Sequence, residues 1–158
     1  MWLSFCGNAI LASSCGALKH TILLCHSEAV MRITCENKGD NLIQARCGSN
    51  KLFVDLPASL GGKDRGVTPS QLMAVSLGCC VNAVITINCN KQGWDATGLK
   101  VQVEYDYLDN PARLGNFKLA ISLPENLREH SDALLEVAKT CPVHKTMEHH
   151  SDMEMTIE

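Results

Sequence analysis

The stretch that decides the fold runs from residue 68 to residue 93 and reads TPSQLMAVSLGCCVNAVITINCNKQG. Thr68 is of a type that caps helices, and Pro69 is favoured at the first helical position. Gly93 suits the left-handed residue that ends a helix. The stretch between them predicts one long helix with an apolar face formed by Met73, Leu77, Cys80, Val84 and Ile87. The neighbouring face is apolar too, so we expect burial on most sides of this helix.

Shorter patterns flank the predicted helix on both sides. Alternating apolar and polar residues predict strands at 32–35, 42–47, 51–55, 99–107, 117–123 and 153–157. A turn at 37–40 separates the first two strands, and a glycine-rich loop at 61–67 leads into the helix. Two further helices are expected, one from Pro124 through Lys139 and a short one from Pro142. Strands paired as antiparallel hairpins beside separate helices indicate an α+β fold.

The first 30 residues differ from the rest of the chain. They contain one lysine, Lys19, and one acidic residue, Glu28, and they lack the pattern of a secretory signal or a transit peptide. Strand-like sequence begins directly after Met31. We therefore expect an extension of unknown role at 1–30 and a single domain at 31–158, which is an ordinary domain size.

Composition excludes several classes of partner. The formal charge is −3, with 14 basic and 17 acidic residues mixed along the chain, and only 4% of residues are aromatic. Nucleic-acid binding is therefore not expected. The longest apolar stretch, 72–87, is interrupted by polar residues and reads as too short to span a bilayer, so no membrane partner is expected. The nine cysteines are odd in number and contain no CxxC motif, which indicates free thiols in a reducing compartment, the cytoplasm.

Two of these cysteines stand in settings that favour redox chemistry. Cys141 precedes Pro142, which places its sulfur at a predicted helix start, where the helix dipole is expected to lower the pKa of the thiol. Cys80 lies on the predicted buried face of the long helix, close to Gly78, which would allow a close approach. The alternative is that both are core cysteines packed as small apolar side chains.

One charged candidate and one set of metal-binding candidates accompany the thiols. Arg65, in the glycine-rich loop, is either a solvated charge or a guanidinium that lowers the pKa of a nearby thiol and orients a substrate. His144 follows Cys141 on the same helix face and, with other cysteines and histidines, would offer zinc ligands, although without a recognised zinc spacing. The further ligands in that alternative are Cys79, Cys80, His149 and His150.

Three segments together resemble the OsmC/Ohr family, the osmotically inducible protein C and organic hydroperoxide resistance proteins. These segments are Gly62 through Cys80, the Gly93-Trp94-Asp95 step, and Cys141-Pro142-Val143-His144. The resemblance covers residues 31–158. It implies an α+β fold in which antiparallel sheets wrap around long central helices in an intertwined homodimer, with active sites near the dimer interface.

The resemblance also implies roles for single residues. Cys80 matches the cysteine that attacks the peroxide, Cys141 matches the resolving cysteine, and Cys79 is the alternative nucleophile. Ser70 stands where the peroxidase members carry a glutamate that holds a catalytic arginine. Arg65 belongs to an Asp-Arg-Gly motif that resembles the OsmC-like branch of the family, and we place the chain in that branch.

The function that follows from this resemblance is a thiol-dependent peroxidase. It would reduce organic hydroperoxides with two cysteines and an external dithiol reductant, and it would need no metal and no organic cofactor. Ser70 favours an alternative, a non-enzymatic protein of this fold that binds a small apolar ligand or senses oxidation. The third hypothesis is a structural zinc protein.

Overall fold

The computed structural model describes residues 32–149 and 153–157, so the predicted extension at 1–30 lies outside the described residues. The first three strands form an antiparallel sheet in chain order, made of β1 (Ile33–Asn37), β2 (Ile43–Cys47) and β3 (Asn50–Val54). Asp40 and Asn41 take positive φ angles of 52° and 63° in the turn between β1 and β2. Both are residue types whose short polar side chains tolerate that region. The predicted early strands and their turn are therefore confirmed.

The central helix α1 (Pro69–Gln92) has the predicted bounds because both of its ends are specified locally. Thr68 Oγ1 accepts from the Gln71 backbone N–H at 3.2 Å, and Gln71 Oε1 accepts from the Thr68 N–H at 2.9 Å, so the two residues form a capping box. Gly93, at φ 73°, ends the helix by donating its N–H to the carbonyls of Asn90 and Cys89.

The buried side of α1 differs from the predicted one. Met73 and Ile87 are 41% and 42% exposed, and Cys80 and Val84 are half-buried. The buried set is rotated to Ala74, Leu77, Gly78, Val81, Ile85 and Cys89. The sequence could not orient the helix because apolar residues surround it. The expectation that most sides would be buried is wrong for the single chain.

The predicted hairpin is present as β4 (Lys100–Leu108) and β5 (Arg113–Ser122), which pair antiparallel with an irregularity between Glu104 and Asp106. The helix predicted from 124 to 139 is divided into a 3₁₀ helix (Glu125–His130) and α2 (Ser131–Ala138). The short helix α3 (Pro142–Glu148) begins at the predicted proline. Residues 153–157 form no strand, contrary to the prediction, and Met153, Met155 and Ile157 are at least 81% exposed.

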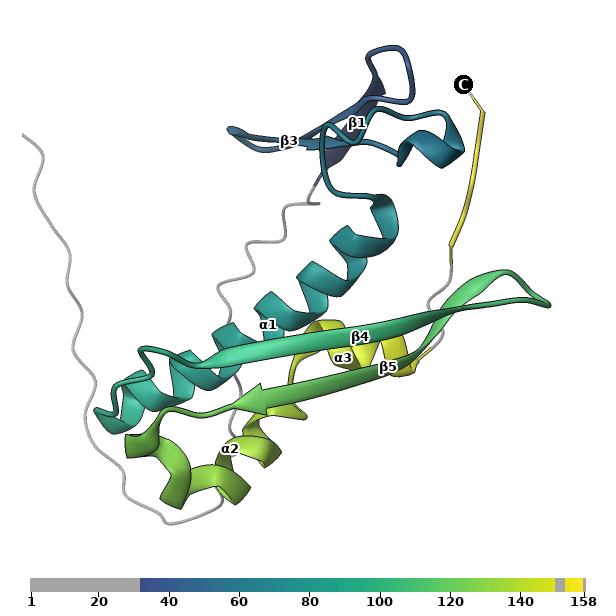
Figure 1. Ribbon diagram of the computed structural model, residues 1–158. Helices are drawn as coiled ribbons and strands as arrows, with labels where there is room; N and C mark the ends of the chain where they lie inside the picture. The colour runs from purple at the N-terminus through teal and green to yellow at the C-terminus, as the bar shows by residue number, and fades with distance from the viewer. Residues whose placement is uncertain (1–31, 150–152, 158) are drawn as a thin grey trace, which may run out of the picture. The chain divides into compact units, whose positions relative to one another are not determined.

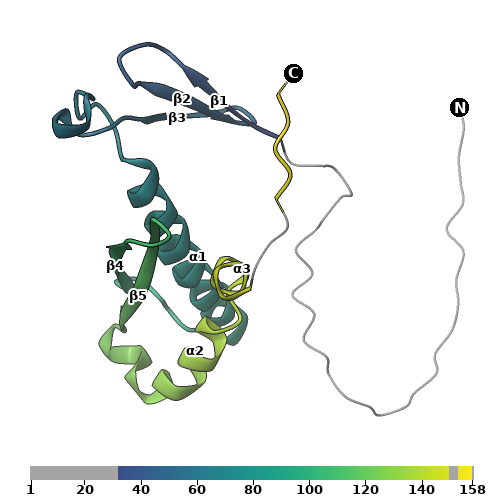
Figure 2. The same cartoon turned by 90° about the vertical axis from the view of Figure 1, so that its right-hand side faces the viewer.

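The β4–β5 hairpin, α2 and α3 all pack against α1 and enclose the main core, as Figures 1 and 2 show. The most deeply buried side chains of this core come from α1, the 3₁₀ helix, α2 and the residue that precedes α3: Leu77, Val81, Ile85, Cys89, Leu127, Leu134 and Cys141. Gly78 allows the hairpin to approach, because a Cβ atom there would lie 3.0 Å from Val103 Cγ2. The close approach expected at Gly78 is therefore made by β4.

By length and composition alone, α1 could also cross a membrane, with a mean hydropathy of 1.8 over its most apolar window. The expectation that this stretch is too short is therefore wrong. The contacts of α1 with β4, α2 and α3 are those of a core helix, which passes the same test.

Candidate functional site

The two cysteines singled out from the sequence come together between α1 and the start of α3. Cys141 is the N-cap residue of α3 and is 0% exposed. Cys80 is half-buried and packs against the same core. The Cys80 thiol lies close enough to Cys141 to raise the pKa of its thiol. Two free thiols from distant parts of the chain are thus neighbours.

The pKa of the Cys141 thiol is shifted in the direction opposite to the predicted one. Burial raises the pKa of the Cys141 thiol, and the neighbouring Cys80 thiol raises it further. The backbone N–H groups of His144 and Val143 donate to the sulfur and act in the lowering direction, as a helix start should. Desolvation is the largest cause, because the loss of water around a thiolate raises the pKa by more than the two backbone donors lower it.

Arg65 lies in a loop that is organised by a buried carboxylate. Asp55 is 1% exposed, and its Oδ2 accepts from Arg65 Nε at 2.7 Å and from the Arg65 and Lys63 backbone N–H groups at 3.2 Å. These donors, Arg65 first, hold the pKa of the Asp55 carboxyl well below its usual range. Arg65 Nη2 donates to the Asp40 carbonyl at 2.8 Å. Within the chain Arg65 therefore pairs with Asp55, and its role beside a thiol stays a prediction.

Ser70 occupies the first turn of α1 and is engaged by two hydroxyl groups. Its Oγ lies 3.0 Å from Thr68 Oγ1 and forms a short hydrogen bond with the hydroxyl of Tyr107 on β4. The Ser70 position is thus occupied by a neutral pair of hydroxyl groups.

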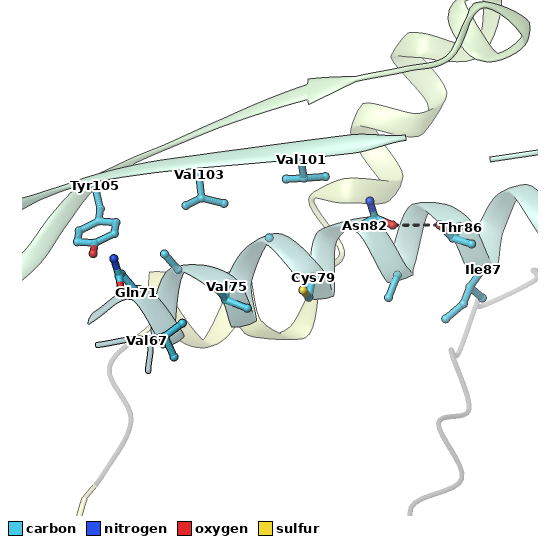
Figure 3. A pocket seen from close by; sticks show the side chains of 13 residues that line it. Val67, Gln71, Val75, Cys79, Asn82, Thr86, Ile87, Val101, Val103 and Tyr105 are labelled. Atoms are coloured by element: carbon cyan, nitrogen blue, oxygen red, sulfur yellow. Dashed lines mark hydrogen bonds between the residues drawn. The ribbon is translucent and has the colours of Figure 1, made fainter. Parts of the chain in front are cut away.

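Cys79 points to a different place from Cys80. It is exposed and lines an open groove of about 830 Å³ between α1 and β4, shown in Figure 3. Apolar side chains dominate the groove, and Gln71, Asn82, Thr86 and the hydroxyl of Tyr105 are its polar groups. Thr86 Oγ1 donates to Asn82 Oδ1 at 3.3 Å, and Asn82 Nδ2 donates to the Leu99 carbonyl at 3.2 Å.

A second cavity of about 130 Å³ lies between α1, β5, α2 and α3. Among the residues that the structure describes, neither Cys80 nor Cys141 lines either of these two cavities. The described residues also contain no group of three or more histidine, cysteine or acidic side chains placed to hold a metal ion. His149 Nδ1 lies 2.9 Å from the Lys145 carbonyl at the end of α3, and His150 lies outside the described residues.

A family model described as OsmC-like protein matches residues 61–156. The chain belongs to the OsmC family. The matched segment contains α1, the hairpin, α2 and α3, and so both Cys80 and Cys141. The resemblance read from the sequence is thereby confirmed, and so is the α+β fold.

Solved structures agree with this assignment. A protein of Psychrobacter arcticus 273-4, provisionally assigned to osmotic stress and detoxification, is 25% identical with a TM-score of 0.68, over 75% of this chain and 88% of that one. The organic hydroperoxide resistance protein OhrB of Bacillus subtilis is 18% identical with a TM-score of 0.56, over 77% and 92%. A Vibrio cholerae protein, provisionally named an organic hydroperoxide resistance protein and crystallised with captopril in one active site, is 18% identical with a TM-score of 0.53, over 78% and 88%. No match was found among curated proteins.

Sequence reasoning missed three features of this OsmC-like site. Asp55 as the partner of Arg65, Tyr107 as the partner of Ser70, and the groove beside Cys79 all depend on contacts between segments far apart in the chain. Asp55 carried one local signal, since a charged residue directly after an alternating strand is a candidate for a buried contact. Tyr107 carried none, because the alternation of its strand placed it only on a face.

Proposed function

We propose that this OsmC-family protein is a thiol-dependent peroxidase that reduces organic hydroperoxides with Cys80 and Cys141. The observation that supports the proposal most is the proximity of two free thiols, one on the central helix and one at the start of α3. Family membership, which includes relatives named for organic hydroperoxide resistance, supports the substrate class.

The proposed reaction begins at Cys80. Its thiolate attacks the distal oxygen of the hydroperoxide, the O–O bond breaks, and the alkoxide takes up a proton and leaves as the alcohol. Cys80 becomes a sulfenic acid. The Cys141 sulfur then attacks the Cys80 sulfur, an S–S bond forms, and the oxygen leaves as water. An external dithiol reduces the disulfide by thiol–disulfide exchange and completes the cycle. No step requires a metal or an organic cofactor.

The division of roles between the two cysteines follows from their burial. Cys141 is fully buried with a raised pKa, which suits a thiol that must meet only its neighbour. Cys80 is half-buried and is therefore the more accessible of the pair. Arg65 is the candidate that would orient the peroxide. Asp55 holds the Arg65 guanidinium, which is the role that the resemblance gives to a glutamate at the position of Ser70.

We also propose that the protein works as a homodimer in the cytoplasm. Three large apolar side chains of α1, those of Met73, Val75 and Ile87, are 41–48% exposed in the single chain. Val75 and Ile87 line the open groove, which a second copy would cover. All six described cysteines are free thiols, which fits a reducing compartment.

Single-residue variants test the peroxidase proposal. With cumene hydroperoxide and a dithiol, we expect Cys80→Ser to abolish peroxide consumption. We expect Cys141→Ser to allow one turnover and to leave a trapped sulfenic acid at Cys80. Cys79→Ser is the matched control because its thiol lies on the same helix but faces the groove. If Cys79→Ser abolishes consumption while Cys80→Ser does not, the assignment of the nucleophile is wrong.

The alternative function is binding of a small apolar ligand without turnover. The open groove of about 830 Å³ and the neutral Ser70–Tyr107 pair favour it. The two functions are separated by counting the free thiols of reduced protein after addition of cumene hydroperoxide. Loss of two thiols per chain supports the peroxidase, and an unchanged thiol count supports the ligand-binding protein.

A further inference from the structure

Cys35 and Cys47 are a second pair of free thiols, and the proposed reaction gives them no role. Cys35 lies on β1 and Cys47 at the end of β2, and both are exposed. In the antiparallel register Cys47 stands opposite Ile33, and Cys35 stands opposite Ala45. Residues two apart on a strand share one face of the sheet. The two thiols are therefore diagonal neighbours on the same face of the β1–β2 ladder.

The spacing of paired strands decides what can join these thiols. Diagonal neighbours on one face of an antiparallel pair have Cα atoms about 7–8 Å apart. A disulfide needs Cα atoms within about 6.8 Å and sulfurs about 2.05 Å apart. A metal ion bound in line by two thiolates, each at about 2.3 Å, holds the sulfurs up to about 4.6 Å apart. The diagonal pair therefore suits a bridging metal ion better than a direct S–S bond.

The surroundings of the pair select the kind of ion. The described residues contain no group of three or more histidine, cysteine or acidic side chains placed to hold a metal ion, so the pair offers two ligands of this kind. Ile33 and Ala45 opposite the thiols carry hydrocarbon side chains, and Asn50, which pairs with Cys47 from β3, carries an amide that suits hard ions. Structural zinc takes four ligands, whereas Cu(I) is selected by soft thiolates and is satisfied by two of them in line.

We propose that Cys35 and Cys47 bind one Cu(I) ion between them, at a site separate from the Cys80–Cys141 pair. Each thiol loses its proton as its Cu–S bond forms, so one ion and two thiols give one dithiolate complex and two protons. The copper stays Cu(I) and neither sulfur is oxidised, so no further reactant is consumed. Both thiols are exposed, so the ion reaches them without opening the fold, whereas Cys141 is 0% exposed.

Protection of each thiol from alkylation tests whether the two share an ion. Reduced protein is given one equivalent of Cu(I) without oxygen and is then treated with N-ethylmaleimide, and the modified cysteines are identified by mass spectrometry. We expect copper to slow the alkylation of Cys35 and of Cys47 by roughly tenfold or more, since the reagent needs the metal-free thiol. Cys35→Ser should remove the protection of Cys47, and Cys47→Ser that of Cys35, because one thiolate does not hold the ion.

Cys79→Ser is the matched control, because it removes another exposed free thiol, which lines the groove beside α1. We expect it to leave the protection of Cys35 and Cys47 intact. Protection of Cys47 that persists in Cys35→Ser overturns the inference, since the two thiols then do not share an ion. Copper that protects Cys80 and Cys141 instead also overturns it. Equal protection of Cys35 and Cys47 by Zn²⁺ contradicts the choice of a two-coordinate ion.

Discussion

At the scale of single residues, burial decides the chemistry of the titratable groups more than local sequence does. The proline after Cys141 sets up a helix start, and two backbone N–H groups do reach the sulfur, yet the pKa of the thiol is raised because it is enclosed. Asp55 is as deeply buried, but its pKa is lowered because an arginine and three backbone donors surround the carboxylate. Burial beside a cation and three backbone donors thus lowers the pKa of Asp55, whereas burial beside two backbone donors alone leaves the pKa of Cys141 raised.

Asp55 should make the stability of the protein depend on acid. Its pKa in the folded chain is below the ordinary value of 3.8, so the stabilisation is complete above that value and is lost as the pH falls below it. We expect Asp55→Asn to lower the free energy of unfolding at neutral pH and to flatten its dependence on pH below about 4. Urea unfolding at several pH values measures both.

The control for this prediction is Asp64→Asn in the same loop, since Asp64 is exposed and accepts one backbone N–H at 3.3 Å. Its loss should change stability little. Equal effects of the two variants would show that the ion pair of Asp55 with Arg65 does not organise the loop.

The residues also show what the sequence could predict of the site. The Cys141-Pro142 step predicts the start of α3. The resemblance to the family predicts that Cys80 and Cys141 act as a pair, and the structure places them as neighbours. The pKa of Cys141 could not be predicted, because desolvation depends on the side chains that enclose the sulfur. The partners of Arg65 and Ser70 could not be predicted either, because Asp55 and Tyr107 reach them from other segments.

At the scale of elements, α1 organises the molecule. Its ends were predictable to the residue, since the capping box at Thr68 and the left-handed Gly93 are local features. The side of α1 that is buried was not predictable, because a helix with apolar residues on all sides has no single apolar face. The helix predicted at 124–139 begins as a 3₁₀ helix, and the pattern at 153–157 finds no neighbouring strand in the described chain. Paired elements were predicted well, whereas an unpaired strand was not, since a strand needs a partner.

The buried side of α1 gives a prediction for stability. Leu77 is 1% exposed at the centre of the core, so we expect Leu77→Ala to lower the free energy of unfolding by about 3 kcal/mol through lost contacts and the cavity left behind. Lys91→Ala, at the exposed end of the same helix, should change it by less than about 0.5 kcal/mol. Chemical denaturation measures both. Equal losses in the two variants would mean that the helix is not oriented as described.

At the scale of the whole molecule, the described residues of the single chain leave large apolar side chains exposed. Val75 and Ile87 of α1 are 48% and 42% exposed, and an open groove of about 830 Å³ runs between this helix and β4. Patches of this kind mark interaction surfaces. A homodimer with long helices at its centre would cover the groove.

We therefore expect a stable homodimer that buries roughly 2,000 Å² or more in total. Sedimentation velocity at micromolar concentration should show a dimer. Val75→Glu should shift it toward monomer, because a carboxylate would be desolvated in the interface, while Lys118→Glu on the exposed side of β5 should leave it dimeric. A wild-type protein that sediments as a monomer would contradict the proposed assembly.

The central claim is that Cys80 and Cys141 form a redox pair, and the map of disulfides after peroxide treatment tests it most directly. Reduced protein is treated with one equivalent of cumene hydroperoxide, digested without reduction and analysed by mass spectrometry. Fragmentation distinguishes Cys80 from Cys79 beside it. We expect one dominant cross-linked peptide that joins Cys80 to Cys141. An unmodified Cys80 in a sample whose other cysteines are oxidised would contradict the claim.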